Sequence, residues 1–259
     1  MSQRPLILVT NDDGITAPGL RKLISIMNTL GEVVVVAPDS PQSAMGHAIT
    51  INSTLYLEAV TIDDGPQKEY SCSGTPADCV KLAVNEILDR RPDLCVSGIN
   101  HGSNSSINVI YSGTMSAALE AGIESIPAIG FSLLDYNWSA DFEACEAFVK
   151  KIATNVLEHG LQDGVVLNVN IPKLDKDQIK GIKVCRQARA NWKEEFDKRT
   201  NPMGRDYYWL TGKFINMDHG EDTDEWALEN GYVSVVPVQF DLTAHHSIQQ
   251  LNTWNFNEE

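Results

Sequence analysis

Two adjacent aspartates, Asp12 and Asp13, directly follow a short and strongly apolar segment near the start of the chain. Residues 6–9 read Leu-Ile-Leu-Val, which is typical of a strand that is buried on both faces of a parallel sheet. Ligands of open α/β sheets bind just beyond the carboxyl ends of such strands. We therefore expect an α/β fold with a ligand site at the end of the first strand.

The aspartate pair has two interpretations. Two neighbouring carboxylates repel each other, and removing each from water costs free energy, so a hard divalent cation would offset both costs. Successive strand residues point to opposite faces, so the chain must leave strand geometry for both acids to reach one ion, and Gly14 permits that turn. Alternatively, the acids cap the next helix and complement its dipole. The dipeptide alone leaves both interpretations open.

Length and charge restrict the classes of function. The chain has 259 residues with 42% hydrophobic content, which suffices for one sizeable core, or one core with a small appendage. The formal net charge is −15, so the basic surface that binds a nucleic-acid polymer is missing. A small anion would need a local positive source, such as a metal ion or a helix N-terminus.

Cysteine usage and hydropathy predict a cytoplasmic protein. The five cysteines are odd in number, and no pair has CxxC spacing. We expect reduced, buried thiols, as is usual in the cytosol. No signal peptide is visible, and no apolar run approaches the roughly 20 residues that span a bilayer. We therefore expect no membrane partner.

Strand-like and helix-like apolar patterns alternate up to residue 169. This regular β-α-β order predicts a doubly wound, mostly parallel sheet flanked by helices. Thr16 is the expected N-cap of the first helix, and Thr75, Pro76 and Asp78 form the expected start of the second. The expected strands are residues 6–10, 33–37, 93–96, 127–131 and 165–169, with a less buried strand around residues 55–60, and the expected helices begin near residues 16, 75, 113 and 141.

The pattern changes after Pro172. Residues 182–229 contain shorter, strand-like and partly polar segments, and we interpret them as an appended β-rich region used in oligomer contacts. A further strand is expected at residues 232–238 and a last helix at residues 245–254. The acidic run at residues 221–225 predicts solvated turns or a helix N-terminus.

Four polar segments follow separate strands or open separate helices, and in a parallel sheet they would converge on one edge. Their side chains form an all-oxygen set that suits Mg²⁺ or Mn²⁺ and lacks the Cys and His pairs of structural zinc. The amides at the start of the helix at Gly113 can hold a phosphate-like anion. The segments are residues 11–14, 38–47, 97–104 and 112–114, and they contain Asp12, Asp13, Ser43, Asn100, Asn104, Ser112 and Thr114.

Each of these residues has a simpler interpretation when it is taken alone. Ser43 is typical of a loop or a cap, and Asn100 is typical of a turn because asparagine tolerates the left-handed conformation. His47 and His101 are loop histidines for which solvation or local hydrogen bonding is the simpler expectation. The convergence of four segments, rather than any single residue, therefore indicates the site.

The motifs in combination resemble the stationary-phase survival protein SurE family, whose members are metal-dependent nucleoside monophosphate phosphatases. The resemblance extends over nearly the whole chain and is weakest at residues 188–224. The matching stretches are residues 11–14, 17–19, 36–39, 43–44, 74–80, 96–100 with Gly102 and Asn104, 111–114, 167–172, 231–234 and 241–245.

The resemblance implies a site, a cofactor and a domain division. Asp12, Asp13, Ser43 and Asn100 fall on the family's four metal ligands, and one Mg²⁺ or Mn²⁺ per subunit is expected. The phosphate-holding positions correspond to Asn104, Ser112, Gly113 and Thr114. Residues 1–180 would form a Rossmann-like catalytic domain, and residues 181–259 a smaller part that exchanges elements in a homodimer or homotetramer.

The expected function is hydrolysis of nucleoside 5′-monophosphates, and of 3′-monophosphates as well. Asp12 or Asp13 would accept the proton of the attacking water, and His101 is a candidate acid for the leaving group. Two alternatives stay open. One is a phosphatase with an aspartyl-phosphate intermediate, although such enzymes usually carry two acids separated by one residue. The other is a non-catalytic nucleotide sensor, because a fold alone does not define function.

Overall fold

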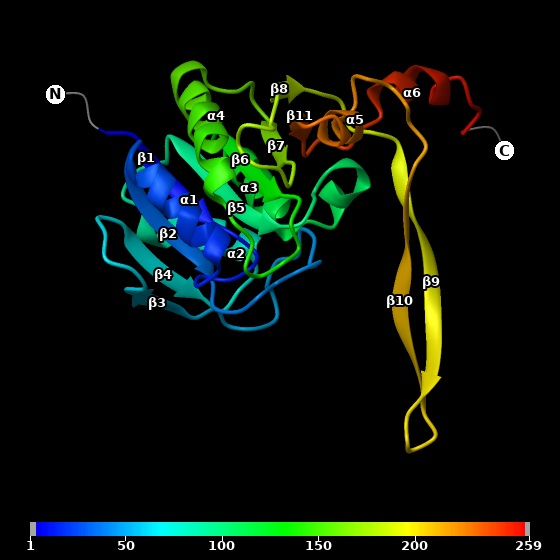
Figure 1. The fold of residues 1–259 in the computed structure, drawn as a ribbon, viewed down its shortest axis with the longest axis horizontal. Helices are drawn as coiled ribbons and strands as arrows, with labels where there is room; N and C mark the ends of the chain where they lie inside the picture. The colour runs from blue at the N-terminus through cyan, green and yellow to red at the C-terminus, as the bar shows by residue number, and fades with distance from the viewer. Residues whose placement is uncertain (1–3, 257–259) are drawn as a thin grey trace.

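A nine-stranded mixed sheet forms the centre of the computed structural model, which describes residues 4–256 (Figure 1). The strand order is β3-β4-β2-β1-β5-β6-β7-β11-β8. The strands are β1 (Leu6–Thr10), β2 (Glu32–Pro38), β3 (Leu57–Val60), β4 (Lys68–Cys72), β5 (Leu94–His101), β6 (Ala128–Leu133), β7 (Val165–Ile171), β8 (Gly181–Val184) and β11 (Tyr232–Gln239).

The six strands from β4 to β7 along this order are parallel to one another. β3 is antiparallel to β4 at one edge, β11 is antiparallel to β7, and β8 is parallel to β11 at the other edge. The expected doubly wound α/β fold is confirmed. The carboxyl ends of β1, β2, β5 and β6 therefore lie at the same edge of the sheet.

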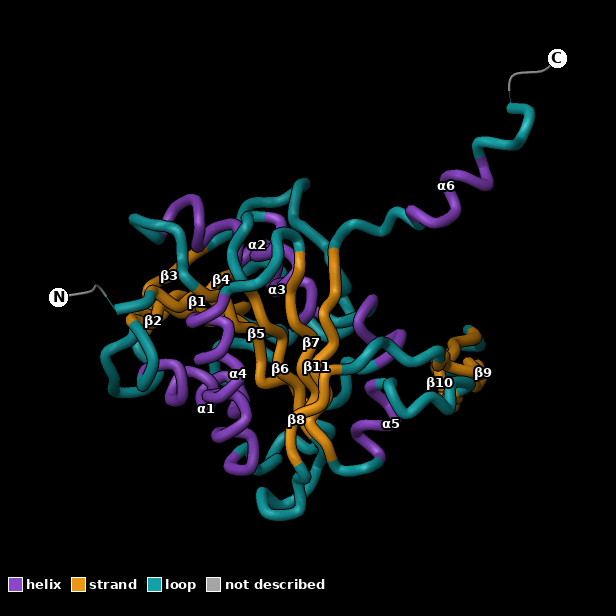
Figure 2. Tube along the Cα trace, turned by 90° about the horizontal axis from the view of Figure 1, so that it is seen from above, coloured by secondary structure: helices purple, strands orange, loops and turns teal. Residues whose placement is uncertain are grey.

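Helices cover both faces of the sheet (Figure 2). α1 and α4 lie on one face, and α2 and α3 lie on the other. Strand β1 explains both layers, because Ile7 and Val9 join one apolar core while Leu6 and Leu8 join the second. The bounds are α1 (Pro18–Asn28), α2 (Pro76–Leu82) with a π-helical continuation (Ala83–Ile87), α3 (Gly113–Ile123) and α4 (Glu146–His159).

The helix starts test two expected caps. Thr75 caps α2 as expected: it accepts a hydrogen bond from the Asp78 amide, and the Asp78 side chain accepts one from the Thr75 amide. The expectation for Thr16 is wrong, since α1 begins at Pro18 with Ala17 at the N-cap position. Proline at the first helical position has no N–H to satisfy, so a side-chain cap is less needed there.

The C-terminal part divides between the sheet and a projecting hairpin. β8 and β11 extend the central sheet, whereas β9 (Ala190–Thr200) and β10 (Asp206–Asn216) form a separate antiparallel ribbon that leaves the body (Figure 1). The short helices here are α5 (Asp224–Glu229) and α6 (His245–Leu251). The predicted domain boundary at residue 180 stays a prediction. The ends of the two predicted domains, residues 1–3 and 257–259, lie outside the described residues.

The remaining helical turns are short 3₁₀ segments at Ser106–Ile110 and Glu143–Cys145. Within residues 4–256, every helix falls short of the length and apolar character that crossing a bilayer requires.

Candidate active site

A cavity of about 260 Å³ lies at the carboxyl edge of the parallel strands. The lining of this cavity combines residues from all four of the polar segments named above, so the expected convergence is observed. Six of the eight predicted site residues line it, namely Asp12, Asp13, Ser43, Asn100, Asn104 and Ser112. Gly113 and Thr114 do not line it and instead pack against Asp12.

Asp12 is a buried carboxylate, with only 5% of its surface exposed. Burial, and then repulsion from Asp13, raises its pKa to about 6, although hydrogen bonds from Thr114 act in the opposite direction. The Thr114 hydroxyl donates to Oδ1 of Asp12 over 2.6 Å. This bond fixes the orientation of the carboxylate, and lone pairs remain on its oxygens for a ligand or a proton.

Gly113 allows helix α3 to begin directly against Asp12. A Cβ at position 113 would lie 2.6 Å from Cβ of Asp12 and 2.7 Å from its Oδ2. The positive end of the α3 dipole therefore lies beside the carboxylate, where it favours negative charge.

Asp13 and Asn100 complete the acidic end of the cavity. The His101 amide donates to Oδ2 of Asp13 over 3.3 Å. Burial raises the pKa of Asp13, and this amide opposes the effect. Asn100 donates from Nδ2 to the Gly102 carbonyl over 3.0 Å, so its Oδ1 is the atom available to a cation.

The loop that carries Ser43 is tied to the body on both sides of that residue. The Gln42 amide donates to the Asp12 carbonyl over 2.7 Å. His47 pairs through Nε2 with the buried Glu120 over 2.8 Å, so local bonding is the correct interpretation of this histidine. Further along, Thr50 donates to Asp78 from its amide and its hydroxyl.

Sequence reasoning missed two asparagines that hold Asn104. The Asn104 amide donates to Oδ1 of Asn170 over 2.8 Å, and Nδ2 of Asn168 donates to the Asn104 carbonyl over 2.8 Å. The Asn104 side chain itself donates to the Ser132 hydroxyl. The signal was present, because two asparagines interrupt the apolar strand β7 and buried polar groups require partners.

Sequence reasoning also missed the role of the acids at the start of α5. Asp224 is fully buried and accepts hydrogen bonds from the amides of Ser106 and Ala188 over 2.8 and 2.9 Å. Glu225 accepts one from the Ser105 hydroxyl. The expectation of a solvated turn is wrong for Asp224, and the alternative, a helix N-terminus, is confirmed. These contacts join the loop after β5 to the base of the hairpin.

His101 lines the cavity, and its ring lies in an aromatic setting. Its ring stacks on Trp138 at 5.3 Å and meets the edge of Phe142 at 5.1 Å between centroids. Nδ1 lies 2.9 Å from the Asn137 carbonyl, which can only accept, so Nδ1 carries a proton. Nε2 has no hydrogen-bond partner among the described residues. Its role as the acid for the leaving group stays a prediction.

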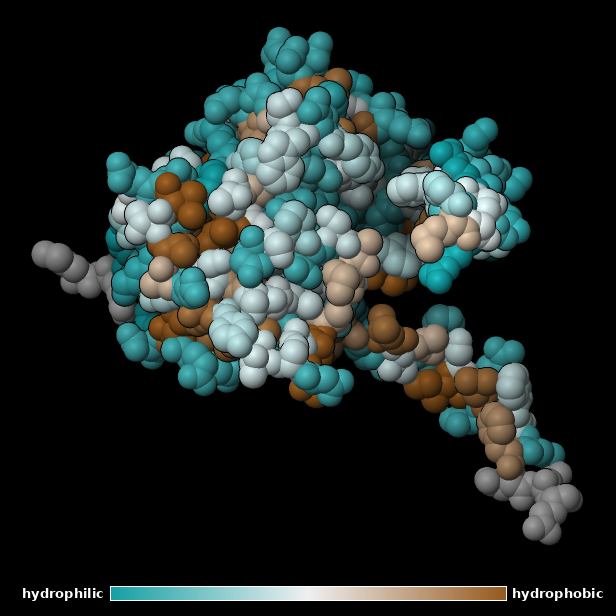
Figure 3. Space-filling model, turned by 90° about the horizontal axis from the view of Figure 1, so that it is seen from below, coloured by the Kyte–Doolittle hydropathy of each residue, from teal (hydrophilic) through white to brown (hydrophobic). Residues whose placement is uncertain are grey.

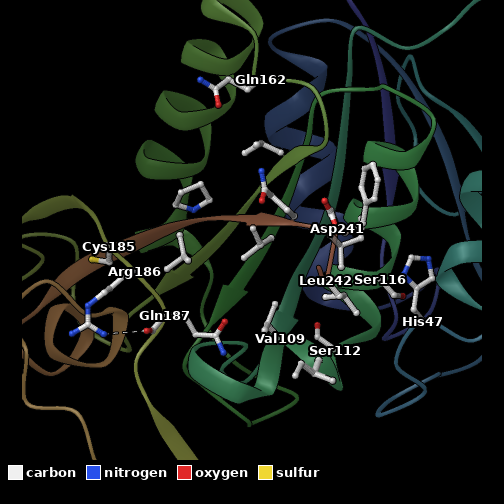
Figure 4. Close-up of a pocket in the computed structure, with 18 residues that line it drawn as sticks. His47, Val109, Ser112, Ser116, Gln162, Cys185, Arg186, Gln187, Asp241 and Leu242 are labelled. Carbon is white, nitrogen blue, oxygen red and sulfur yellow. Dashed lines mark hydrogen bonds between the residues drawn. The ribbon is translucent and has the colours of Figure 1, made fainter. Parts of the chain in front are cut away.

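A larger cavity of about 830 Å³ also has Ser112 in its lining (Figure 4). It shares Ser112 with the smaller cavity but contains neither Asp12 nor Asp13. Its walls come largely from β11 and the segment that follows it, including Asp241 and Leu242. The paired carboxylates therefore assign the chemistry to the smaller cavity.

The donor set fits a hard divalent cation. Burial raises the pKa values of Asp12 and Asp13, because it disfavours their charged forms. A nearby positive charge would reduce this free-energy cost. Hydroxyl and amide oxygens from Ser43 and Asn100 line the same cavity. Among residues 4–256 no cluster of three or more His, Cys, Asp and Glu could hold a metal. A cation at this site would be bound by carboxylate, hydroxyl and amide oxygens together.

Known proteins match this chain in sequence and in structure. The sequence profile described as "Survival protein SurE" matches residues 7–194. A protein of Flavobacterium johnsoniae named 5′-nucleotidase SurE is 74% identical over 255 residues, with 98% of each chain covered. One of the same name from Bacteroides fragilis is 47% identical, again with 98% of each chain covered.

A solved structure shares the fold. The SurE protein from Aquifex aeolicus has a TM-score of 0.83 and 40% sequence identity, and the match covers 96% of this chain and 98% of that one. Agreement of the profile, of full-length relatives and of the fold leaves one conclusion. The chain belongs to the survival protein SurE family.

Proposed function

We propose that this protein is a metal-dependent 5′-nucleotidase that also acts on nucleoside 3′-monophosphates, releasing nucleoside and phosphate. The observation that carries the proposal is the buried pair Asp12 and Asp13 beside the N-terminus of α3, because it places cation ligands next to anion-binding amides. The relatives named 5′-nucleotidase SurE support the same activity.

Asp12, Asp13, Ser43 and Asn100 would hold one Mg²⁺ or Mn²⁺ ion. When bound, such an ion supplies charge for a phosphoryl oxygen and lowers the pKa of water. The protein's own contribution is to hold the ligands in place. Thr114 fixes one oxygen of Asp12, the His101 amide fixes one oxygen of Asp13, and the Asn100 side chain is anchored on the Gly102 carbonyl.

The start of α3 would hold the phosphate. The Gly113 and Thr114 amides are the first N–H groups of the helix, which have no partner within a helix. The Thr114 amide acts on Asp12 in this structure, so Gly113 is the amide that is free for a phosphate oxygen. Ser112 accepts a hydrogen bond from the Met115 amide, so its hydroxyl proton is available to a phosphate oxygen. Asn104 donates one side-chain hydrogen to Ser132 and retains a second one for the substrate.

Proton transfer is assigned to Asp12 or Asp13. A general base must lie within hydrogen-bond reach of the proton that it takes, and both carboxylates line the cavity where the water would bind. A carboxylate oxygen that does not bind the cation would take the proton of the attacking water.

The direct test is phosphate release from a series of nucleoside 5′- and 3′-monophosphates, with and without EDTA. We expect turnover that EDTA abolishes and that added Mg²⁺ or Mn²⁺ restores. Nucleotide binding without phosphate release would identify a nucleotide sensor instead. Full activity in a rigorously metal-free sample would contradict the proposed metal role.

A second copy of the chain is the proposed partner of the C-terminal part, as a homodimer or homotetramer. No residue of α6 is buried, and Figure 3 shows hydrophobic side chains along the segment that carries it. The hairpin also exposes large apolar side chains, a pattern that marks protein contacts. These residues include Phe196, Trp209 and Leu210 on the hairpin and Leu242, Ile248 and Leu251 around α6.

Light scattering after size-exclusion chromatography tests the assembly. We expect more than one copy per particle, and we expect Phe196→Ser with Trp209→Ser to shift the particle toward the monomer. A monomeric wild type would contradict the exchange of elements. A cytoplasmic location is proposed with this function, and the five buried free thiols support it.

A further inference from the structure

We propose that Trp192 and Tyr136 form the seat for the base of the nucleotide, in the cavity that holds Asp12 and Asp13. This inference rests on the proposed nucleotidase function and adds a subsite to it. It assigns a role in substrate binding to the base of the hairpin and to the loop after β6.

Both aromatic rings line the same cavity as the paired carboxylates. Trp192 lies at the start of β9, and Tyr136 lies in the loop that follows β6. Their exposed fractions are 41% and 74%, so each ring keeps a face in contact with solvent. The same cavity therefore combines a pair of carboxylates, which could bind a cation, with exposed aromatic rings.

Contacts hold Trp192 in this position. Its indole Nε1 donates to Oδ1 of Asn108 over 2.8 Å, and its ring meets Phe214 in a T-shaped contact at 5.5 Å. Asn108 belongs to the 3₁₀ turn between β5 and α3. The indole is thus joined to the segment that leads to the phosphate-binding end, and little conformational freedom would be lost when a ligand stacks on it.

Contacts also hold Tyr136 in place, in the loop that follows β6. A Cβ at position 102 would lie only 2.3 Å from Cε1 of its ring, so Gly102 is what allows the ring to lie on the backbone there. The Ser103 amide also donates to the Tyr136 hydroxyl over 3.4 Å. An exposed aromatic ring with this support is better explained by a ligand than by packing.

The chemistry of the lining selects a planar, uncharged group. Asp12 and Asp13 are the acidic residues of the lining, which contains no Lys or Arg. Aromatic stacking accepts every nucleobase, since each base has a π-face. The seat therefore predicts that purine and pyrimidine nucleotides are both accepted, with stacking rather than base-specific hydrogen bonds supplying the binding.

The test compares substrates with and without a base. For wild type, Trp192→Ala, Trp192→Phe and Tyr136→Ala, kcat/KM is measured with AMP, with UMP and with ribose 5-phosphate. We expect the ratio of AMP to ribose 5-phosphate to fall about tenfold in Trp192→Ala, through KM, since one stacked base is worth about that much. Trp192→Phe should retain most of the ratio, because it keeps a ring.

The controls separate stacking from structure. Tyr56→Ala removes an exposed tyrosine outside the cavity and should keep the wild-type ratio. Because Trp192 lies on the hairpin, the particle size of each variant is measured as well. Tyr136→Ala lies outside the hairpin and decides the question if Trp192→Ala changes the assembly.

Two results would overturn the inference while leaving the nucleotidase standing. One is an unchanged ratio in both alanine variants, and the other is a wild type that uses ribose 5-phosphate as well as AMP. A wild type that releases phosphate from none of the three substrates, with metal present, would instead overturn the proposed function and the base seat with it.

Discussion

The hydroxyl of Thr114, at the start of α3, donates a 2.6 Å hydrogen bond to Oδ1 of Asp12, at the end of β1. The bond joins the helix that would receive the phosphate to the carboxylate that would hold the cation. The Thr114 side chain and its backbone amide therefore both act on Asp12, and the phosphate-holding role predicted for this residue stays a prediction.

Thr114→Val is expected to weaken metal binding and lower turnover. Losing the hydroxyl removes a bond that lowers the pKa of Asp12, so the charged form becomes less favourable. Groups that orient a metal ligand typically contribute about 10- to 100-fold in affinity or activity. Calorimetric titration with Mg²⁺ measures the first effect and phosphate release the second. Thr114→Ser is the control, and unchanged metal affinity in Thr114→Val would contradict the role.

The contribution of Asp12 to the stability of the metal-free protein should fall as the pH rises from about 4 to about 6. Asp12 has a pKa of about 6 in the folded state against 3.8 ordinarily. Between these values the folded protein binds the proton and the unfolded chain does not, so raising the pH favours unfolding. The cost above this range is on the order of 3 kcal/mol.

Asp12→Asn and Asp13→Asn connect this stability effect to activity. Asp12→Asn should flatten the pH profile of thermal unfolding, because the titrating group is gone. Each variant should lose most of its turnover, because it keeps the shape of the side chain and removes its charge. Near wild-type activity of either variant at saturating metal would show that the aspartate has been assigned wrongly.

Gly113→Ala separates close packing from helix propensity. Alanine favours a helix over glycine by roughly 0.5–1 kcal/mol, so local propensity alone predicts a harmless or stabilising change. A Cβ at this position, however, would lie 2.6 Å from Cβ of Asp12. We expect Asp12 to be displaced and turnover to fall at least tenfold, measured by phosphate release. Unchanged kinetics would show that α3 can shift at no cost.

Asn170→Ala should lower turnover without removing a group that contacts the substrate. The Asn104 amide would lose its acceptor, which lies 2.8 Å away, and an unsatisfied buried amide costs about 1–3 kcal/mol. Thermal unfolding measures that cost, and inhibition by inorganic phosphate reports on Asn104. Weaker phosphate inhibition with unchanged affinity for the metal is the expected combination, and the reverse would place Asn104 at the cation.

The fate of a chiral phosphorus distinguishes water attack from a phospho-enzyme. We expect one displacement by water and inversion of configuration, because the adjacent acids Asp12 and Asp13 line one cavity and are proposed as ligands of the same cation. Retention requires two displacements. Retention, or a phosphoryl group trapped on either aspartate, would contradict direct attack and leave the phosphatase assignment in place.

Local sequence patterns were sufficient for the central parallel strands apart from β4 and for the edge at which the site lies. The apolar run before Asp12 predicted a strand buried on both faces, and Leu8 and Val9 do pack into different cores. The start of α2 was readable because Thr75 and Asp78 bond to each other only three residues apart. Convergence of the polar segments followed from strand polarity alone, which any parallel sheet imposes.

Only the tertiary structure decided which side chains meet within that edge. Asn170 holds Asn104, Asp224 holds Ser106, and Trp192 reaches Asn108, across 66, 118 and 84 residues. Periodicity states which face a residue occupies but not which residue lies opposite it. The partners depend instead on the order of the strands and on where the hairpin leaves the sheet, because those features set which buried polar groups are close enough to satisfy one another.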